Sequence, residues 1–353
     1  MMPLYINGMS CISPQSTFDG TFPFVLKHHE GSRLSCIEPD YSHYIDPKAS
    51  RRMGRLLKYG TTAGLQALRD AGITKPDAIS TGTGFGLLDD SGKFLKNVTE
   101  ANEGVVSPTA FIQSTHNTVS SNIALSVACK GHNNTFVHKA FSLESALTDV
   151  QMLMSEDTNI QNALVGVYDE LTDYSYAVMQ RLHLIRDGSP SHHTLLTDPD
   201  RGTIAGEGAA FFVLDQSPGI HTYAKLLGNE IIYRPLSAEY LQERINTFIN
   251  KCGKSLADID VVVSGLCGDS KRDEMLHTLN KKYLSSPTIV GYKHLCGEYM
   301  TSSGFAMWLA AKIIYEQTIP PSAMLRDRGR APGNILIVNA YKNDYAFMLL
   351  SLA

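Results

Sequence analysis

The sequence predicts an α/β fold, and two features of the chain indicate it. Apolar runs typical of buried strands alternate with segments of helical spacing along the whole length, which is the pattern of α/β proteins with largely buried sheets. The chain has 353 residues, of which 43% are hydrophobic and 19% charged. That is the composition of a globular protein large enough to bury a substantial core, and it excludes a disordered chain.

The first half of this pattern opens with a strand in residues 3–13. A helix is expected from Ser50 to Ala71, because apolar residues recur there at helical spacing and Gly72 is a common C-terminal cap. A Gly-rich turn, TGTGFG, occupies residues 81–86 after a strand that begins at Ala78. The other expected elements are a helix over 107–128, a strand over 133–141, a helix over 142–156, and strands over 162–170 and 205–215.

The pattern starts again after about residue 215. The expected elements are a strand over 222–232, a helix over 238–252, strands over 258–266 and 286–294, a helix over 302–317, and strands over 333–341 and 345–352. Two halves of similar rhythm predict an internal duplication, with residues 1–215 and 216–353 as its units. No linker or low-complexity segment separates them, so we expect the halves to pack as one unit.

Charge and cysteine usage exclude several classes of protein. The net charge is −4, from 31 basic and 35 acidic residues without a long basic run, which argues against nucleic-acid binding. No apolar stretch reaches the roughly 18 residues of a membrane span, and no signal peptide is evident. The six cysteines are scattered without the pairing of a zinc site or a disulfide framework. We therefore expect a cytoplasmic protein without a metal or other cofactor.

Six segments carry a family resemblance, and they follow one another in the family's order. They are the opening strand with Gly8, ASRRMGRLLKYGTTAGLQALRDAGI, TGTGFG, SPTAFIQSTHNTVSSNIAL, DPDRGTIAGEGAAFFVLD and KHLCGEYMTSSGFAMWLAA. Together they resemble the β-ketoacyl synthases over nearly the whole chain, and the Asp-Arg-Gly…Gly-Glu-Gly-Ala segment is the most specific match. The resemblance implies the thiolase fold, in which two duplicated halves form five alternating layers of helix and sheet. It also implies a dimer that handles acyl chains on acyl carrier protein.

The family's catalytic positions hold different residues in this chain. Decarboxylative condensation needs a thiolate nucleophile, two histidines and an oxyanion hole. In the resemblance, the nucleophilic Cys at a strand-to-helix turn falls on Ala140, which cannot form a thioester. The two His positions fall on Gly265 and Glu298. The family's C-terminal Gly-Phe-Gly-Gly loop is matched by NAYKNDY, residues 339–345.

A ketosynthase scaffold without this chemistry resembles the chain-length factors, and most closely those of aryl polyene and related bacterial clusters. Such a subunit pairs with an active ketosynthase in a heterodimer and shapes the acyl tunnel in type II polyketide or fatty-acid-like synthesis. Most of that class carry Gln at the nucleophile turn, whereas this chain has Ala140. The resemblance therefore implies the role of a pairing subunit but no chemistry at position 140. The expected partners are an active ketosynthase and an acyl carrier protein. The expected tunnel or interface residues are Phe111, Ile112, Gln113, Ser114, His116, Phe136, His138 and Phe141.

Three alternatives stay open at this point. Glu298 with Cys296 or Cys267 could serve an acyltransferase, thioesterase or decarboxylase. The chain could also form an inert homodimeric scaffold. At single positions, the simpler interpretations are hydrogen-bonded structural roles for His116 and His138, core packing for the aromatic residues, and a loop-shaping role for Glu207. TGTGFG does not meet the GxGxxG pattern of dinucleotide sites.

Overall fold

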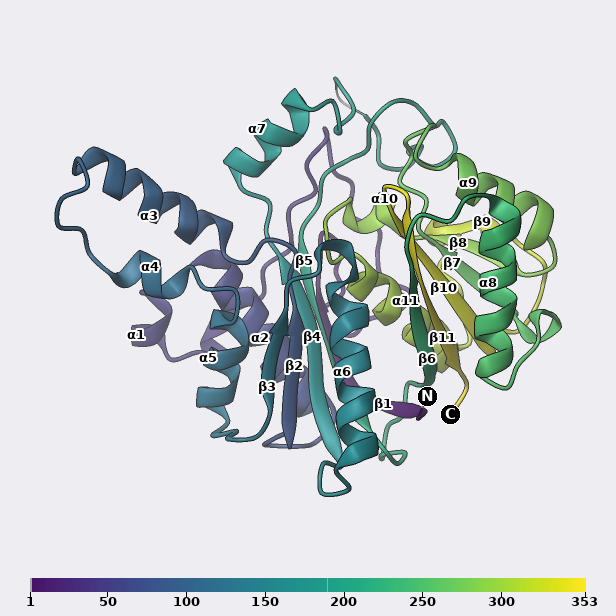
Figure 1. The fold of residues 1–353 in the computed structure, drawn as a ribbon, viewed down its shortest axis with the longest axis horizontal. Coiled ribbons are helices and arrows are strands. Elements are labelled where there is room, and N and C mark those ends of the chain that lie inside the picture. Colours follow the sequence, from purple (N-terminus) through teal and green to yellow (C-terminus); the bar gives the residue numbers. More distant parts are fainter. Residues whose placement is uncertain (1, 189) are drawn as a thin grey trace.

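The computed structural model describes residues 2–188 and 190–353, and it is an α/β structure built on one large sheet (Figure 1). Its strands are β1 (Leu4–Ile12), β2 (Ala78–Gly82), β3 (Asn133–Phe136), β4 (Asn162–Asp169), β5 (Gly208–Asp215), β6 (Ala224–Ile232), β7 (Val261–Ser264), β8 (Thr288–Gly291), β9 (Met324–Arg326), β10 (Asn334–Tyr341) and β11 (Asp344–Ser351).

Helices connect most of these strands. They are α1 (Pro47–Ser50), α2 (Arg55–Asp70), α3 (Leu88–Glu100), α4 (Thr109–Gln113), α5 (Thr118–Ser126), α6 (Ser142–Glu156), α7 (Asp173–Arg181), α8 (Ala238–Lys251), α9 (Glu274–Thr278), α10 (Lys293–Cys296) and α11 (Ser303–Glu316). Single turns of 3₁₀ helix form η1 (Tyr41–His43), η2 (Lys139–Phe141), η3 (Leu256–Asp258) and η5 (Pro321–Ala323), and η4 (Leu279–Tyr283) is a π-helical turn.

The strand order repeats within the sheet. The order is β3-β2-β4-β5-β1-β6-β11-β10-β7-β8-β9. The first five strands in chain order are arranged as third, second, fourth, fifth and first. The strands β6, β7, β8, β10 and β11 repeat this arrangement from the other end, with β9 added at the edge. The two parts join where β1 pairs with β6 over Leu4–Ile6 and Ala224–Leu226. This repeat supports our proposal that the chain divides into halves near residue 215.

The central layer of the molecule consists of α6 and α11, which lie between the two parts of the sheet (Figure 1). Alternate strand residues face them, because successive side chains of a strand point to opposite faces. Val165 of β4 and Val263 of β7 belong to the same buried cluster as Leu147 of α6 and Leu309 of α11. Helix α11 has hydrophobic residues around most of its circumference, which fits a helix covered on both sides.

Two outer helical layers cover the remaining faces of the sheet. Leu164 of β4 packs in a cluster with α2 and α5, and Val262 of β7 packs in a cluster with α8 and α9. The layers therefore follow the order helix, sheet, helix, sheet, helix. This confirms the predicted α/β, thiolase-like fold.

Three predicted element boundaries were wrong, each for a local reason. The helix expected from Ser50 begins only at Arg55, because Gly54 is in an extended conformation with φ −63° and ψ 166°. The helix expected over 107–128 is divided into α4 and α5. Strand β3 stops at Phe136, and Lys139 has a left-handed φ of 52° that no strand can continue.

Several shorter elements carry no strong signal in the sequence. The pattern did not predict α3, α7, α9 or β9, which are short or largely exposed. Helices α3 and α4 project together from the body of the molecule, on the left in Figure 1. None of the described helices combines the length and apolar character that a bilayer crossing requires.

Candidate functional site

The predicted catalytic positions converge around the end of β10, although they are far apart in the sequence. Asn339 of β10 donates a hydrogen bond from Nδ2 to the carbonyl oxygen of Ala140, at 3.2 Å. The same side chain accepts a hydrogen bond from the Tyr292 hydroxyl, at 2.9 Å. One residue farther along, the carbonyl oxygen of Ala340 accepts a hydrogen bond from Lys293 Nζ, also at 2.9 Å. The structure thus brings the turn of Ala140 close to the segment that begins at Lys293.

Ala140 lies in η2, the turn between β3 and α6, and it is buried with 3% of its surface exposed. The turn is held by Ser142 at the start of α6. Its hydroxyl donates to the carbonyl oxygens of Thr83 and Lys139, at 2.9 and 2.8 Å. It also accepts the backbone N–H of His138, at 2.9 Å. The strand-to-helix turn is therefore formed, but its central side chain is a methyl group without nucleophilic character.

Gly265 follows β7 and lies against the backbone of β10. Its N–H donates to the carbonyl oxygen of Val338, at 2.7 Å. A Cβ at this position would lie 2.8 Å from the Ala340 nitrogen and 2.9 Å from the Val338 oxygen. Both distances are shorter than real Cβ contacts, and the obstacles are backbone atoms. No side chain fits at this position unless β10 moves.

Glu298, at the other expected His position, belongs to a buried ion cluster. Its Oε2 lies 2.8 Å from Lys293 Nζ, and its Oε1 lies 3.3 Å from an Arg272 guanidinium nitrogen. The Lys293 and Glu298 side chains are 1% and 10% exposed. Two cations hold this carboxylate, as burial of a charge requires. Both carboxylate oxygens of Glu298 are thus engaged by cations, which agrees with a structural role for this group.

Glu144, on α6, is a second buried carboxyl group next to this cluster. The Ser303 hydroxyl contacts its Oε2 at 3.5 Å, and its Oε1 has no hydrogen-bond partner among the described residues. Burial raises the pKa of Glu144 to about 7, although hydrogen bonds and the Lys293 charge oppose that rise. The sequence analysis did not identify this residue as part of the site.

A tight hairpin occupies the position of the family's Gly-Phe-Gly-Gly loop, which the sequence NAYKNDY had already indicated to be absent. Strands β10 and β11 pair in continuous register as far as Tyr341 and Asp344. Only Lys342 and Asn343 remain to form the turn, and Lys342 has a φ of 55°. A two-residue connection of this kind favours positive φ at its central positions. Because the strand continues through Asn339, no free loop is left here to form an oxyanion hole or a gate.

The two cysteines of the rival interpretation are buried and protonated. Cys267 donates a contact from Sγ to Asp273 Oδ1, at 3.3 Å, and Cys296 makes a similar contact with the Gly297 oxygen, also at 3.3 Å. Burial raises the pKa of both thiols well above the ordinary value. Since the thiolate is the nucleophilic form, these groups are poorly suited to attack a thioester.

The pocket at these positions is too small for a substrate. It is lined by Gly265, Cys267, Arg272, Asp273, Ala340 and Lys342. It leaves no space for even one water molecule. The described residues around Gly265 are therefore closely packed.

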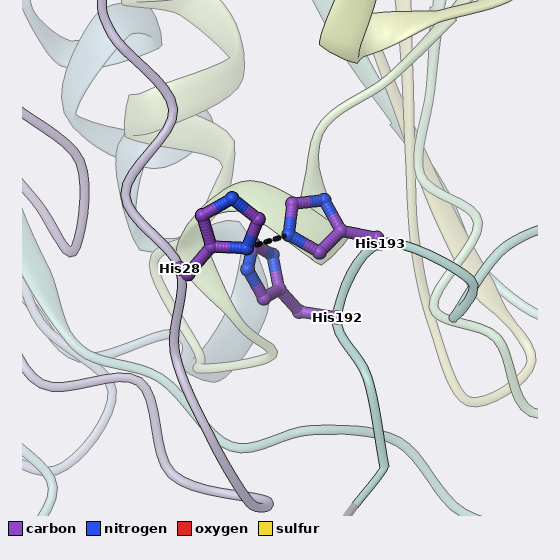
Figure 2. A group of neighbouring side chains, drawn as sticks. All are labelled: His28, His192 and His193. Carbon is purple, nitrogen blue, oxygen red and sulfur yellow. Dashed lines mark hydrogen bonds between the residues drawn. The ribbon is translucent and has the colours of Figure 1, made fainter.

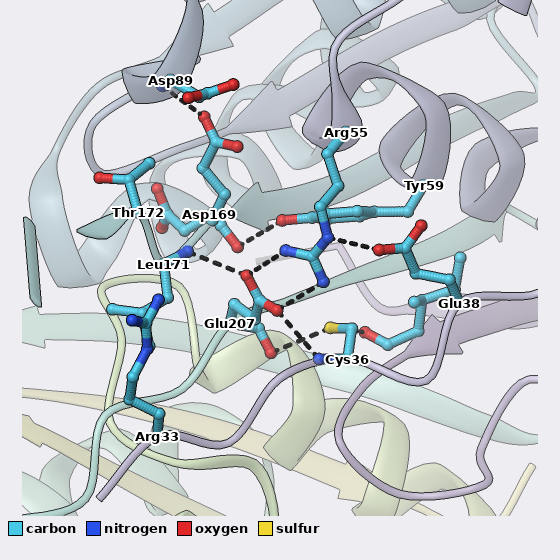
Figure 3. Close-up of polar contacts among 12 residues, drawn as sticks. Arg33, Cys36, Glu38, Arg55, Tyr59, Asp89, Asp169, Leu171, Thr172 and Glu207 are labelled. Atoms are coloured by element: carbon cyan, nitrogen blue, oxygen red, sulfur yellow. Dashed lines mark hydrogen bonds and ion pairs between the residues drawn. The ribbon is translucent and has the colours of Figure 1, made fainter. Parts of the chain in front are cut away.

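Glu207, from the most specific motif, is the centre of a buried hydrogen-bond network (Figure 3). Arg55 of α2 binds both carboxylate oxygens, at 2.6 Å each. The backbone N–H groups of Cys36 and Leu171 donate to the same carboxylate, at 2.9 and 3.0 Å. This bidentate arrangement joins α2, the loop after β4 and the Gly-rich segment before β5. The geometry agrees with the expected loop-shaping role of Glu207.

Asp169, at the end of β4, fixes the TGTGFG turn. Its carboxylate accepts hydrogen bonds from the Thr83 hydroxyl and the Gly84 N–H, at 2.9 Å each. It also accepts the Thr301 hydroxyl, at 2.8 Å. Burial raises the pKa of Asp169, and these hydrogen bonds oppose that shift. The sequence analysis missed this residue, although an acidic residue at the carboxyl end of a buried strand is a usable signal.

Four of the expected tunnel residues lie on or beside the α3–α4 arm, which we define as residues 88–114. Phe111 and Ile112 are 56% and 64% exposed. The Phe111 ring packs on Phe94 of α3, with ring centroids 5.2 Å apart. Gln113 donates to the Arg52 carbonyl oxygen at 2.6 Å, and Ser114 ends α4. An isolated chain thus exposes two large apolar side chains on α4 of this arm.

The other four expected residues lie between the arm and the Ala140 turn. Phe141 is buried and Phe136 is half-buried against the central core. His138 bonds to Ser145 Oγ through Nδ1, at 2.9 Å, and to the Tyr233 hydroxyl through Nε2, at 3.0 Å. His116 is exposed, and its carbonyl oxygen accepts the Tyr168 hydroxyl at 2.9 Å. The contacts of His138 agree with a structural role.

Arg272 and Asn339 are further site residues that the sequence did not indicate. Arg272 comes from an irregular loop and Asn339 from the strand that was expected over 333–341. Their importance depends on distant partners, Glu298 and Ala140, so no local pattern could identify them.

Comparisons with known proteins agree with this fold. The family model of the N-terminal domain of β-ketoacyl synthase matches residues 32–218, which is more than half of the chain. A 3-oxoacyl-acyl-carrier-protein synthase 2 of Synechocystis sp. is 24% identical over 354 residues, covering 87% of this chain and 82% of that protein.

Solved structures of similar fold include the ishigamide ketosynthase/chain length factor, with a TM-score of 0.77 and 16% identity over 100% of this chain and 99% of the other. Another is the ketosynthase ApeO in complex with its chain length factor ApeC from Xenorhabdus doucetiae. It has a TM-score of 0.77 and 15% identity over 100% of this chain and 98% of the other. At these identities the likeness establishes the fold.

Proposed function

We propose that this chain, which belongs to the β-ketoacyl synthase family, is a non-catalytic subunit of the chain-length-factor type. It pairs with an active β-ketoacyl synthase, which supplies the Cys and both His residues. Together the two subunits form the tunnel that holds an acyl chain delivered by acyl carrier protein. The pathway would be a type II polyketide synthesis, of the aryl polyene kind, or a related fatty-acid-like synthesis.

The observation that carries this proposal is the loss of every family catalytic group within an otherwise intact scaffold. Ala140 offers no thiol, Gly265 has no space for a side chain, and Glu298 is held by two cations. Condensation needs a nucleophile and donors that act together. A chain that lacks all of them but keeps the fold is best explained as a partner of a complete enzyme.

The edge of the sheet supports a role in pairing. Strand β3 is the terminal strand of its half, with Asn133 and Asn134 exposed. Val137 next to it is 52% exposed. An unpaired edge with exposed apolar neighbours is a surface that proteins usually cover. A second ketosynthase-like subunit with the same edge strand would cover it.

Known similar proteins support the choice of partner and substrate. The name of the Synechocystis relative refers to an acyl-carrier-protein synthase. The complex from Xenorhabdus doucetiae contains a ketosynthase together with its chain length factor. We extend both descriptions to this chain as part of the proposal.

Co-expression followed by native mass measurement tests the pairing. The chain is expressed with ketosynthases encoded near it, and one ketosynthase that carries all three catalytic residues should form a complex with one copy of each subunit. A stable monomer in the presence of every candidate would contradict the proposal. A homodimer that excludes the ketosynthase would instead support an inert scaffold.

Alkylation separates the proposal from the rival enzyme. If Cys267 or Cys296 served an acyltransferase or thioesterase, iodoacetamide should modify the native chain, and an acyl thioester should protect it. Because both thiols are buried and protonated, we expect modification only after unfolding. Cys129 and Cys252, which are only partly buried, serve as an internal reference in the same peptide map.

A further inference from the structure

Three histidines from two distant parts of the sequence meet outside the site described above (Figure 2). His28 lies in the irregular segment between β1 and η1. His192 and His193 lie in the segment between α7 and β5. One ring nitrogen of each residue falls within 4.8 Å of those of the other two. The cluster contains no carboxylate and no cysteine.

His192 is oriented as a ligand in advance. Its Nδ1 lies 3.0 Å from the carbonyl oxygen of His294. A carbonyl only accepts hydrogen bonds, so Nδ1 carries the proton and Nε2 presents a lone pair in the neutral ring. His192 is 0% exposed, and its Nε2 has no hydrogen-bond partner among the described residues. A buried unpartnered acceptor of this kind is uncommon and requires a reason.

This arrangement matches the way proteins hold metal-binding histidines. Such a histidine usually donates its other ring N–H to a backbone carbonyl or a carboxylate, which fixes the tautomer and the ring orientation. In His192 the N–H at Nδ1 is used by the His294 carbonyl oxygen, so Nε2 is the nitrogen left free to bind. The neutral imidazole is the form that binds metal.

His28 and His193 are the two solvent-exposed members of the cluster. His193 Nε2 lies 2.7 Å from His28 Nδ1. In a tetrahedral site with metal–nitrogen bonds of about 2.0–2.1 Å, ligand nitrogens are separated by about 3.3 Å. The separation between His28 Nδ1 and His193 Nε2, 2.7 Å, is shorter than this value, and the ligand nitrogens of all three residues lie within 4.8 Å of one another. Small rotations of two exposed side chains are therefore sufficient to place all three nitrogens around one ion.

We propose that His28, His192 and His193 form a binding site for a divalent transition metal of the zinc class. Three imidazoles without carboxylates suit Zn²⁺, Cu²⁺ or Ni²⁺ and do not suit Mg²⁺ or Ca²⁺, which prefer oxygen ligands. His29 is not among the histidines whose ring nitrogens lie together, and its Nε2–H donates to the Pro14 carbonyl oxygen at 2.7 Å. A water molecule would complete four-coordination on the exposed side.

The site would fasten two irregular segments to the body of the protein. The metal joins the segment of His28 to the segment of His192, and His192 is bonded to His294 in α10. His294 is itself held through Nε2 by the Ser322 carbonyl oxygen, at 2.7 Å. The residue before it, Lys293, belongs to the buried ion cluster of the candidate site. Metal binding would therefore stabilise the loops that cover α10.

Titration with Co²⁺ and Zn²⁺ tests the site. The untagged full-length chain is purified without a metal column, treated with chelator, and titrated with Co²⁺ while the visible absorption is recorded. We expect one Co²⁺ per chain with the intense absorption of a four-coordinate nitrogen site, which added Zn²⁺ should abolish by displacement. Zn²⁺ should also raise the unfolding temperature, because it binds only the folded form.

Substitution of the exposed ligands gives the specific comparison. His28→Ala and His193→Ala should each weaken metal binding by at least roughly 10–100-fold. Loss of a residue that only supports a ligand already costs about that much affinity. Their folds should be unaffected, because both side chains are exposed. His277→Ala, on exposed α9, is the matched control and should bind as the wild type does. No saturable binding by the wild type, or equal binding by all three variants, would overturn the proposal.

Discussion

At position 140 a methyl group stands where condensation requires a sulfur atom. Restoring that atom with Ala140→Cys should not restore condensing activity, because Gly265 and Glu298 still provide no help to decarboxylation. From the same malonyl and acyl carriers, we expect the variant to form less than about a hundredth of the product that an active ketosynthase forms. Loss of a single catalytic group typically lowers the rate by this much or more. Activity close to that of the active enzyme would show that our placement of the other two positions is wrong.

Glu144 gives a pH-dependent prediction. Its folded pKa of about 7 lies above the ordinary value of 4.5, so between those values the folded state keeps a proton that the unfolded state has released. The free energy of unfolding of the wild type should therefore fall as the pH rises from about 4.5 to 7. Above about pH 7, Glu144 should cause little further change in that free energy. Ser303, Asn339 and Lys293 surround the carboxyl group, and their effects are included in this shift.

Glu144→Gln removes the titration while keeping the shape of the side chain. Urea unfolding should show nearly equal stability for the variant and the wild type at pH 5. At pH 8 the variant should be more stable by about 1–3 kcal/mol, given about 1.4 kcal/mol for each pKa unit. A constant difference across this range would mean that Glu144 does not titrate in the way its burial implies.

At the scale of elements, the contact between β7 and β10 explains why the first His position is lost. Gly265→Ala adds a Cβ within 2.9 Å of two backbone atoms of β10, so it should destabilise the chain by about 1–3 kcal/mol through overpacking. Gly92→Ala, in α3, is the matched control. Its Cβ would meet Tyr174 at an ordinary 3.6 Å, and it should stabilise the helix by up to about 1 kcal/mol. Equal denaturation midpoints for the two variants would contradict the packing argument.

The α3–α4 arm carries the prediction about product length. In a reconstituted pair, Phe111→Ala or Ile112→Ala should lengthen the product if these exposed side chains close the end of the shared tunnel. Each methylene of newly buried chain contributes roughly 0.8 kcal/mol, so the balance between stopping and extending should shift measurably. Ser114→Phe should shorten the product. Unchanged product lengths from an intact complex would remove these residues from the tunnel wall.

The sequence predicted the long, periodic elements better than the short ones. Helix α6 and strand β4 have strong patterns, because their burial is spread over many residues. Helix α2 was expected to start too early, since nothing in the apolar spacing reveals the extended backbone at Gly54. The hairpin turn at Lys342 was expected as part of a loop, because the pairing of β10 with β11 depends on two segments at once.

The candidate site shows the same limit. Family positions located Ala140, Gly265 and Glu298, since flanking glycines and strands mark them along the chain. The residues that contact two of these positions, Arg272 and Asn339, come from other elements and became evident only in three dimensions. The histidine cluster is a similar case. The expectation of no metal rested on cysteine spacing, whereas the fold brings His28 next to His193.

For the whole molecule, the five-layered scaffold is complete while its reaction centre is filled. Hydrophobic clusters cover both faces of each half-sheet. The hydrophobic core is therefore intact although the family's catalytic groups are missing. The exposed surface includes the β3 edge and, on α4, Phe111 and Ile112. The intact core and the uncovered edge support our proposal that this chain works together with a partner subunit.

Intact-mass analysis of the co-purified pair tests this claim most directly. The complex of this chain with its active ketosynthase is incubated with an acyl-carrier thioester, and the intact mass of each subunit is then measured. The account predicts one acyl group on the partner's catalytic cysteine and an unmodified mass for this chain, since Ala140 offers no thiolate. A stable acyl adduct on this chain would contradict the account.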